Sequence, residues 1–441
     1  MSRELKLGSH VVNDESPAYV IAEVGHNHQG KMETAKEMFR KAQECGVSAV
    51  KLQKRDNRGL FTEAMFNKPY DHENSFGATY GEHREFLEFD KDHYVELQQF
   101  AAELGLDFFA TAFDQASVDV LASIDLPAYK VASADLRNIP LLTYIAEVGK
   151  PMLVSTGGGT LEDVQRAYDA IMPINPQLCI MQCTCGYPAE FSELNLRVVE
   201  TYREQFSDIV IGYSGHDNGI SMPVVSYVLG ARVIEKHFTL NRAMKGTDHV
   251  FSLEPVGMRK MTRDLERARQ SLGDGKKVVY ASEEAPVVKM GKKLVAARDL
   301  PAGHVVREAD IAIKSPGDGI PPAQMDTVLG KATTGAMARD DAFSPDLLGL
   351  PGPIPIGSMV RSPWSPGRPG VWGRCGSGVS WRRGHGSWRW TWSGLRPARR
   401  CRRCSTVLPR TACCSMQTSS IVRRSSRRER PPRPGSALRL Y

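Results

Sequence analysis

The sequence predicts a (β/α)8 barrel followed by a small second domain. Between residues 18 and 275, short apolar runs rich in β-branched residues alternate with helical patterns, which indicates βαβ units around a parallel sheet. There are eight such runs, the number of strands that closes this barrel. Each run ends in polar or ionisable residues, as expected where a barrel builds its active site at the C-terminal ends of its strands. An open doubly wound sheet is the alternative.

The eight predicted strands follow one another along this region. They are YVIAEV (19–24), AVKLQ (49–53), DFFATA (107–112), AYKVAS (128–133), PMLVST (151–156), LCIMQCT (178–184), IVIGYS (209–214) and RVIEKH (232–237). The first intervening helix, METAKEMFRKAQECG, places Ala35, Met38, Phe39 and Ala42 on one face and closes at Gly46. That spacing is typical of an amphipathic helix with a glycine stop.

The rest of the chain divides into three parts. After the barrel of residues 1–275, residues 276–290 are predicted to be a polar connector and residues 291–350 a compact, loop-rich α+β domain. Residues 351–441 contain 19 Arg and one Glu, without Lys or Asp, and so carry a formal charge of +18; because the whole chain carries +7, residues 1–350 carry −11. This tail also holds all six Trp and five of the nine Cys. We interpret it as an out-of-frame translation of a GC-rich gene and expect it to be disordered.

Composition excludes several functional classes. No run of about 18 apolar residues exists, so no membrane span is predicted. The start, MSRELKLGSH, lacks the apolar segment of a secretory signal. The sparse cysteines of residues 1–350 indicate a reducing compartment, and we expect a cytoplasmic protein. The alternative to an enzyme is a nucleic-acid binder that uses the Arg- and Trp-rich tail; we favour the enzyme, because Cys401 and Cys404 lack an accompanying series of zinc ligands.

Two histidines predict a metal site. His216 in YSGHD follows the seventh strand, and His237 in IEKHFT ends the eighth. Neighbouring strand ends of a barrel lie side by side, so both imidazoles can point into one cavity, near Glu235 and Asp248. Neutral imidazoles with open positions between them bind divalent first-row metals.

Cations and hydroxyls at other strand ends predict an anion-binding floor. Lys51 and Lys130 end the second and fourth strands, and hydroxyls follow at the same level at Ser133, Ser155 and Ser214. This set suits a small substrate with a phosphate and a carboxylate. Glu23, at the end of the first strand, is a candidate general acid and base.

Several motifs together resemble the sialic acid synthase (N-acetylneuraminate synthase) family. They are AEVGHNHQG, VKLQK, FFATAFD, PAYKVASAD, VSTGGG, GYSGHD, IEKHFT and GTDHVFSLEP, in that order. Residues 291–350 resemble the small antifreeze-like (SAF) domain that follows the barrel in this family. The segment 80–89 is predicted to form part of a lid over the sugar.

The resemblance implies a reaction and a set of site residues. In the family, C3 of phosphoenolpyruvate attacks the aldehyde of an N-acylated amino sugar such as N-acetylmannosamine, water adds at C2, and phosphate leaves through C–O cleavage. The metal would be Mn²⁺, with Mg²⁺ or Co²⁺ as alternatives, held by His216 and His237. Glu23 and Asp248 would be catalytic, and the substrates would contact Lys51, Gln53, Thr111, Phe113, Lys130, Ser133, Asp135, Ser155, Tyr187 and Ser214. A domain-swapped homodimer is also implied.

Three departures from the family pattern bear on the sugar. Asp135 stands where the family has Glu, Cys185 where it has Asn, and Ser315, beside Lys314, where many members have an Arg that holds the N-acyl group. Legionaminic and pseudaminic acid synthases, which share this architecture, are therefore alternatives.

Overall fold

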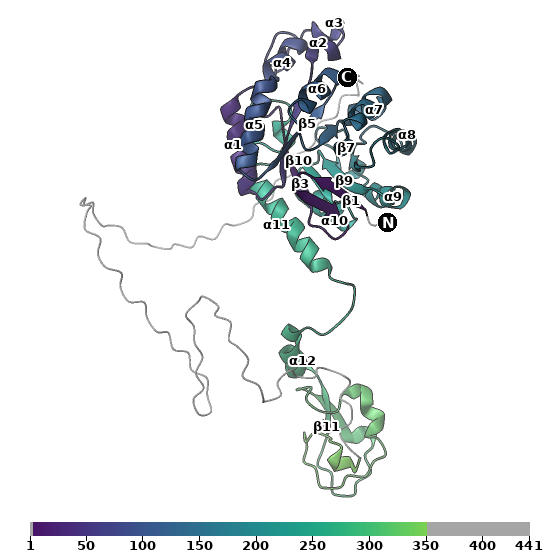
Figure 1. The fold of residues 1–441 in the computed structure, drawn as a ribbon. Helices are drawn as coiled ribbons and strands as arrows, with labels where there is room; N and C mark the ends of the chain where they lie inside the picture. The colour runs from purple at the N-terminus through teal and green to yellow at the C-terminus, as the bar shows by residue number, and fades with distance from the viewer. Residues whose placement is uncertain (1–2, 351–441) are drawn as a thin grey trace, which may run out of the picture. The chain divides into compact units, whose positions relative to one another are not determined.

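Eight parallel strands close into a barrel in the computed structural model, which describes residues 3–350 (Figure 1). The strands are β3 (Tyr19–Gly25), β4 (Ala49–Lys54), β5 (Asp107–Ala112), β6 (Tyr129–Val131), β7 (Met152–Ser155), β8 (Leu178–Cys183), β9 (Val210–Gly215) and β10 (Val233–His237). Because β10 pairs with both β9 and β3, the sheet has no edge. The predicted barrel is confirmed, and the open sheet is wrong.

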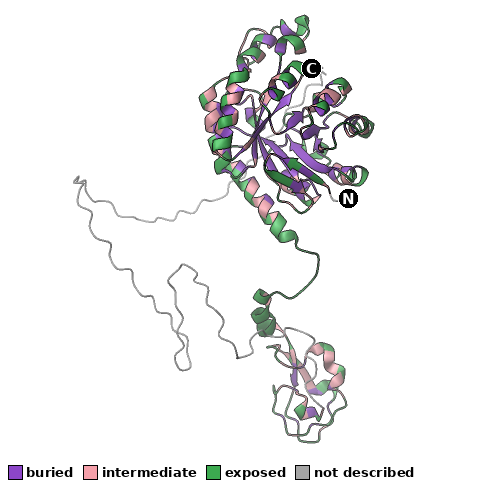
Figure 2. Ribbon diagram, in the orientation of Figure 1, coloured by how far each residue is buried: buried purple, intermediate pink, exposed green. Residues whose placement is uncertain are grey.

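The strands form because their side chains are buried on both faces. All seven residues of β3 and all six of β8 and β9 are buried, which is why these runs are continuously apolar rather than alternating. Figure 2 shows the buried strands enclosed by helices whose outer faces are exposed. Each observed strand begins within one residue of its predicted start.

The helices of the barrel follow the strands in turn. They are α1 (Met32–Glu44), α5 (Lys91–Glu103), α6 (Gln115–Ala122), α7 (Ile139–Glu147), α8 (Leu161–Ile171), α9 (Val198–Gln205), α10 (Ser221–Val228) and α11 (Pro255–Leu272). In α1 the buried residues are the predicted Ala35, Met38, Phe39 and Ala42. The chain leaves this helix at Gly46, whose φ of 76° favours glycine.

Two additions lie at opposite ends of the strands. Before the barrel, β1 (Glu4–Leu7) and β2 (His10–Asn13) form an antiparallel hairpin, and its turn at Gly8 lies against Asp107, the first residue of β5. After β4, the short helices α2 (Asn57–Leu60), α3 (Glu63–Phe66) and α4 (Tyr80–Leu87) precede α5. The hairpin thus contacts the N-terminal end of the sheet, whereas the insertion follows the C-terminal end of β4.

The second domain has its own core. It contains an antiparallel pair, β11 (Lys293–Ala296) and β12 (Ile311–Lys314), and buries Leu294, Leu300, Val306, Val328 and Phe343, among others. The connector predicted for residues 276–290 includes a 3-10 turn (Ala281–Glu283) and a short α-helix, α12 (Glu284–Met290). No helix within residues 3–350 is long and apolar enough to cross a membrane. The tail, with the disorder and nucleic-acid binding considered for it, lies outside the described residues.

Candidate active site

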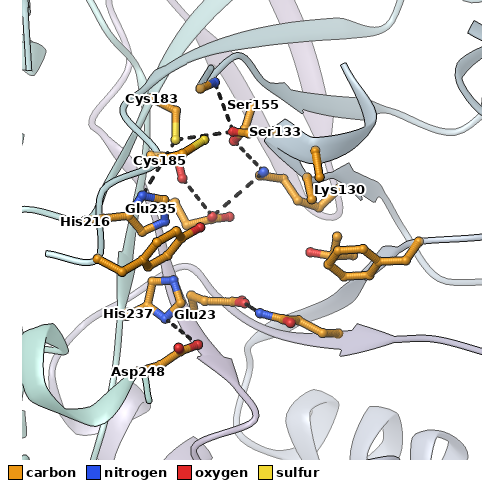
Figure 3. Close-up of a pocket in the computed structure, with 18 of the residues that line it drawn as sticks. Glu23, Lys130, Ser133, Ser155, Cys183, Cys185, His216, Glu235, His237 and Asp248 are labelled. Atoms are coloured by element: carbon orange, nitrogen blue, oxygen red, sulfur yellow. Dashed lines mark hydrogen bonds and ion pairs between the residues drawn. The ribbon is translucent and has the colours of Figure 1, made fainter. Parts of the chain in front are cut away.

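A cavity of about 800 Å³ opens where the barrel strands end (Figure 3). Apart from Asp135, all the predicted site residues line it: Glu23, Lys51, Gln53, Thr111, Phe113, Lys130, Ser133, Ser155, Tyr187, Ser214, His216, His237 and Asp248. Asp135 lies on the 3-10 turn after β6, where its carboxylate accepts a hydrogen bond of 3.1 Å from Asn138. The barrel therefore gathers residues from all eight strand ends into one cavity.

The two histidines lie side by side, with ring centroids 5.2 Å apart. Nδ1 of His216 lies 2.9 Å from the carbonyl oxygen of Thr184. A hydrogen bond donated to that oxygen leaves the Nε2 lone pair of the ring free. His237 turns its Nδ1 toward Asp248, 3.7 Å away, and this buried nitrogen makes no hydrogen bond with the described residues.

Both imidazoles are suited to bind a cation. Burial lowers the pKa of His216 and of His237 to about 4, so both rings are neutral at neutral pH. Within residues 3–350, no group of three or more His, Cys, Asp or Glu side chains is arranged to hold a metal. The pair would supply two ligands, one fewer than the three protein ligands typical of catalytic zinc sites, and leave the remaining positions for water or substrate.

Lys51 lies in a network of buried polar groups on the cavity floor. Its Nζ lies 2.6 Å from Oε2 of Glu23 and donates to Oγ1 of Thr111 at 2.7 Å. Gln53 donates to the other oxygen of Glu23 at 2.7 Å. Burial raises the pKa of Glu23, although the ammonium of Lys51 opposes that shift. A raised pKa brings a carboxyl closer to the range in which it can both donate and accept a proton.

Glu235 is a floor residue whose role the sequence left open. Its Oε2 lies 3.7 Å from Nζ of Lys51, its Oε1 lies 3.9 Å from Nζ of Lys130, and it accepts a hydrogen bond from Ser214 at 3.1 Å. Burial alone would raise its pKa, but the two lysines outweigh burial and lower the pKa to about 2. Lys130 also donates to Ser155 at 2.5 Å. We call Glu23, Lys51, Lys130 and Glu235 the floor.

A serine and two cysteines line the cavity beside Lys130. Ser133 accepts a hydrogen bond from the backbone N–H of Gly157 at 3.0 Å and donates to Sγ of Cys183 at 3.4 Å. The hydrogen bond from Cys183 lowers the pKa of the Cys185 thiol to about 6. A Cβ atom at residue 157 would lie 2.2 Å from Sγ of Cys185, so glycine permits this approach. The departure at Cys185 therefore falls inside the cavity.

Aromatic rings cover the histidines. The Tyr187 ring lies 4.3 Å from the His216 ring, and the Phe251 ring lies 4.9 Å from that of His237, measured between centroids. These contacts restrict the orientation of both imidazoles.

Two arginines that the sequence did not single out also line the cavity. Arg55, just after β4, lies with Nη1 3.2 Å from Nε2 of His26, and Arg84, on α4, lies with Nη1 3.3 Å from Nδ1 of the same ring. We call His26, Arg55 and Arg84 the rim. The lid predicted for residues 80–89 was the sequence signal for Arg84, whereas Arg55 lies in a loop, and loops carry no periodicity.

The third departure lies in the second domain. Ser315 accepts a hydrogen bond from Lys292 at 2.6 Å, and Lys314 pairs with Asp340. The side chains of Lys314 and Ser315 thus both interact with residues of their own domain.

Fold and site together define a class: a (β/α)8-barrel enzyme with two buried lysines on the cavity floor and a histidine pair suited to a divalent metal. Residues 38–277 match the model of the NeuB family, and residues 293–349 match that of the SAF domain. The chain belongs to the NeuB family, and is a phosphoenolpyruvate-using enzyme of the sialic acid synthase type.

Known relatives differ in their products. The chain is 37% identical to human N-acetylneuraminate-9-phosphate synthase over 338 residues, covering 76% of this chain and 94% of that protein. It is 32% identical to N,N'-diacetyllegionaminic acid synthase of Legionella pneumophila over 319 residues, covering 71% and 89%. The solved sialic acid synthetase of Leptospira borgpetersenii, in complex with citrate, superposes with a TM-score of 0.57 at 29% identity, over 65% of this chain and 96% of that one.

Proposed function

We propose that the protein condenses phosphoenolpyruvate with an N-acylated amino-sugar aldehyde of the N-acetylmannosamine type, giving a sialic-acid-like nonulosonic acid and phosphate. The observation that carries the proposal is the histidine pair in the same cavity as the two buried floor lysines. Phosphoenolpyruvate needs cationic donors for its phosphate and carboxylate, and the aldehyde needs an electrophilic partner for its oxygen.

Lys51 and Lys130 would hold the two anionic groups of phosphoenolpyruvate, with hydroxyl donors at Ser133, Ser155 and Ser214. This arrangement would direct C3 of the enol toward the aldehyde carbon. The new C–C bond forms as the aldehyde oxygen takes up a proton, water adds at C2, and phosphate departs when the C2–O bond breaks. Glu23, with its raised pKa, is the group we assign to this proton transfer, with Asp248 as the second catalytic carboxylate.

His216 and His237 would hold the divalent ion, for which we propose Mn²⁺, with Mg²⁺ or Co²⁺ as alternatives. When bound, the ion supplies Lewis-acid polarisation of the aldehyde oxygen. The buried Nδ1 of His237 that lacks a hydrogen bond, and the low pKa of both rings, support this assignment.

We also propose that the enzyme works in the cytoplasm as a domain-swapped homodimer, as the family resemblance implies. Light scattering on the full chain would give the mass of two chains. A monomeric mass at assay concentrations would contradict it.

Phosphate release tests the reaction. The purified chain would be stripped with a chelator, supplied with phosphoenolpyruvate and a panel of aldehydes, and assayed with and without Mn²⁺. The panel contains N-acetylmannosamine and the acetamido sugars that lead to legionaminic and pseudaminic acids. We expect metal-dependent release with the N-acetylmannosamine type; preference for another panel sugar would reassign the product, and no release with any sugar would reject the proposal.

A further inference from the structure

The rim arginines lack an acidic partner in the part of the chain that the structure describes. Arg55 is only 7% exposed and Arg84 is half-buried, yet neither guanidinium forms an ion pair with a carboxylate among residues 3–350. Burial, with the charge of Arg84, lowers the pKa of Arg55 to about 10, which still leaves it charged at neutral pH. By contrast Arg137, which also lines the cavity, pairs with Asp163 at 2.8 Å. A buried charge is costly unless it is paired, and within residues 3–350 the rim arginines have no counter-ion.

The hydrogen bonds at the rim are also incomplete. Burial and the two arginines lower the pKa of His26 far below its ordinary value, so its ring is neutral. A neutral imidazole has one acceptor nitrogen and one N–H, and a guanidinium has donors only. His26 can therefore accept a hydrogen bond from only one of the two arginines that contact its ring nitrogens. The other arginine faces the ring N–H, which cannot accept a hydrogen bond. An anion would supply the missing acceptors.

The rim lies next to Glu23, the residue assigned to proton transfer at the aldehyde oxygen. Arg55 donates through Nη2 to Oε1 of Gln53 at 2.7 Å, and Gln53 donates to Glu23. The two anionic groups of phosphoenolpyruvate are already assigned to Lys51 and Lys130, which lie on the floor beside buried carboxylates rather than at the rim. An anion at the rim is therefore expected to belong to the sugar.

We propose that Arg55 and Arg84 form a second anion site that binds a phosphate ester on the amino-sugar aldehyde. The inference rests on the proposed function and narrows its substrate to a phosphorylated sugar. Two guanidiniums can each offer paired N–H donors to phosphate oxygens. Family membership leaves this open, since the curated relatives include synthases named for phosphorylated and for unphosphorylated products.

The test compares N-acetylmannosamine with its 6-phosphate on the full chain with Mn²⁺ and phosphoenolpyruvate. We expect kcat/KM to favour the phosphate ester, and Arg84→Gln to reduce that preference about 10- to 100-fold, as for loss of a charged hydrogen bond. Arg58→Gln is the matched control, because Arg58 is an exposed arginine of the same insertion that pairs with Glu85 and does not line the cavity. An unchanged preference in Arg84→Gln would overturn the inference.

Binding of the unreactive alditol, N-acetylmannosaminitol 6-phosphate, gives a second readout by calorimetry. We expect Arg84→Gln to raise its Kd about 10- to 100-fold, and inorganic phosphate to bind much more weakly than the alditol phosphate. Equal binding of inorganic phosphate would show a site for the free anion and overturn the inference. If neither sugar is consumed, the proposed function fails, while the alditol still decides whether the rim binds a sugar phosphate.

Discussion

On the floor of the cavity, Lys51 and Lys130 lie within 4 Å of buried carboxylates, whereas on the rim Arg55 and Arg84 have no carboxylate partner among the described residues. The floor residues lie at strand ends, whereas the two rim arginines lie in the segment after β4 and the rim histidine follows β3. The charges of the floor balance one another without substrate, whereas those of the rim do not.

The difference indicates what the charges of each region contribute to. Removing one partner from a buried ion pair costs several kcal/mol, because a charge is left behind without compensation. The floor should therefore contribute to folding as well as to the binding of phosphoenolpyruvate, whereas the rim should contribute only to the binding of the sugar. The following predictions test that division, beginning with the largest effect.

Loss of a proposed metal ligand should have the greatest consequence. We expect His216→Ala to lower both Mn²⁺ affinity and turnover by more than about 100-fold, since outer-shell partners of a metal alone are worth about 10- to 100-fold. Calorimetry with Mn²⁺ and the phosphate-release assay would measure the two effects. His93→Ala, at a half-exposed histidine of α5, is the control; wild-type Mn²⁺ affinity in His216→Ala would remove this residue from the site.

Removing a floor carboxylate should destabilise the fold. Glu235→Gln takes a counter-charge from Lys51 and Lys130, and we expect the free energy of unfolding to fall by about 3 kcal/mol. Urea unfolding followed by circular dichroism would measure this change.

The matched rim substitution should behave differently. Arg84→Gln removes a charge that has no acidic partner among the described residues, so we expect the free energy of unfolding to change by less than about 1 kcal/mol. If both substitutions destabilise the protein equally, the division between floor and rim is wrong.

Arg137 extends the comparison, because it lines the cavity but, unlike the rim arginines, forms an ion pair with a carboxylate. Hydrogen bonds from the Thr160 backbone and from Arg137 lower the pKa of Asp163 to about 2. The unfolded value is about 3.9, so this carboxylate stabilises the fold above that pH, and its contribution is lost as the pH falls toward 2. Unfolding titrations from pH 5 to pH 2 should show a shallower loss of stability in Asp163→Asn than in the wild type; identical slopes would contradict this.

The smallest effect is expected at Asp135. Its carboxylate lies outside the cavity lining and bonds Asn138, so Asp135→Asn should change kcat/KM for the sugar less than about threefold. A loss above about tenfold in the same assay would return Asp135 to the substrate-binding residues.

The barrel and the floor were largely predictable from the sequence. Continuous apolar runs identified strands buried on both faces, and polar residues at their ends identified Lys51, Lys130, His216 and His237. These inferences succeed because strand geometry is local and the C-terminal ends of parallel strands share one face. Membership of the sialic acid synthase family, predicted from the motif order, is confirmed; the individual roles of the site residues stay predictions.

The sequence by itself determined the barrel, its strand ends and the family, because the order of apolar and polar residues along the chain predicts which segments are buried and what periodicity they have. Only the tertiary structure decided that Glu235 faces the two lysines, that Cys185 enters the cavity while Asp135 does not, and that Arg55 and Arg84 share one histidine. Those facts depend on side-chain direction and on loop paths between segments far apart in sequence. Neither leaves a periodic pattern in the chain, so only the folded arrangement reveals which charges are paired.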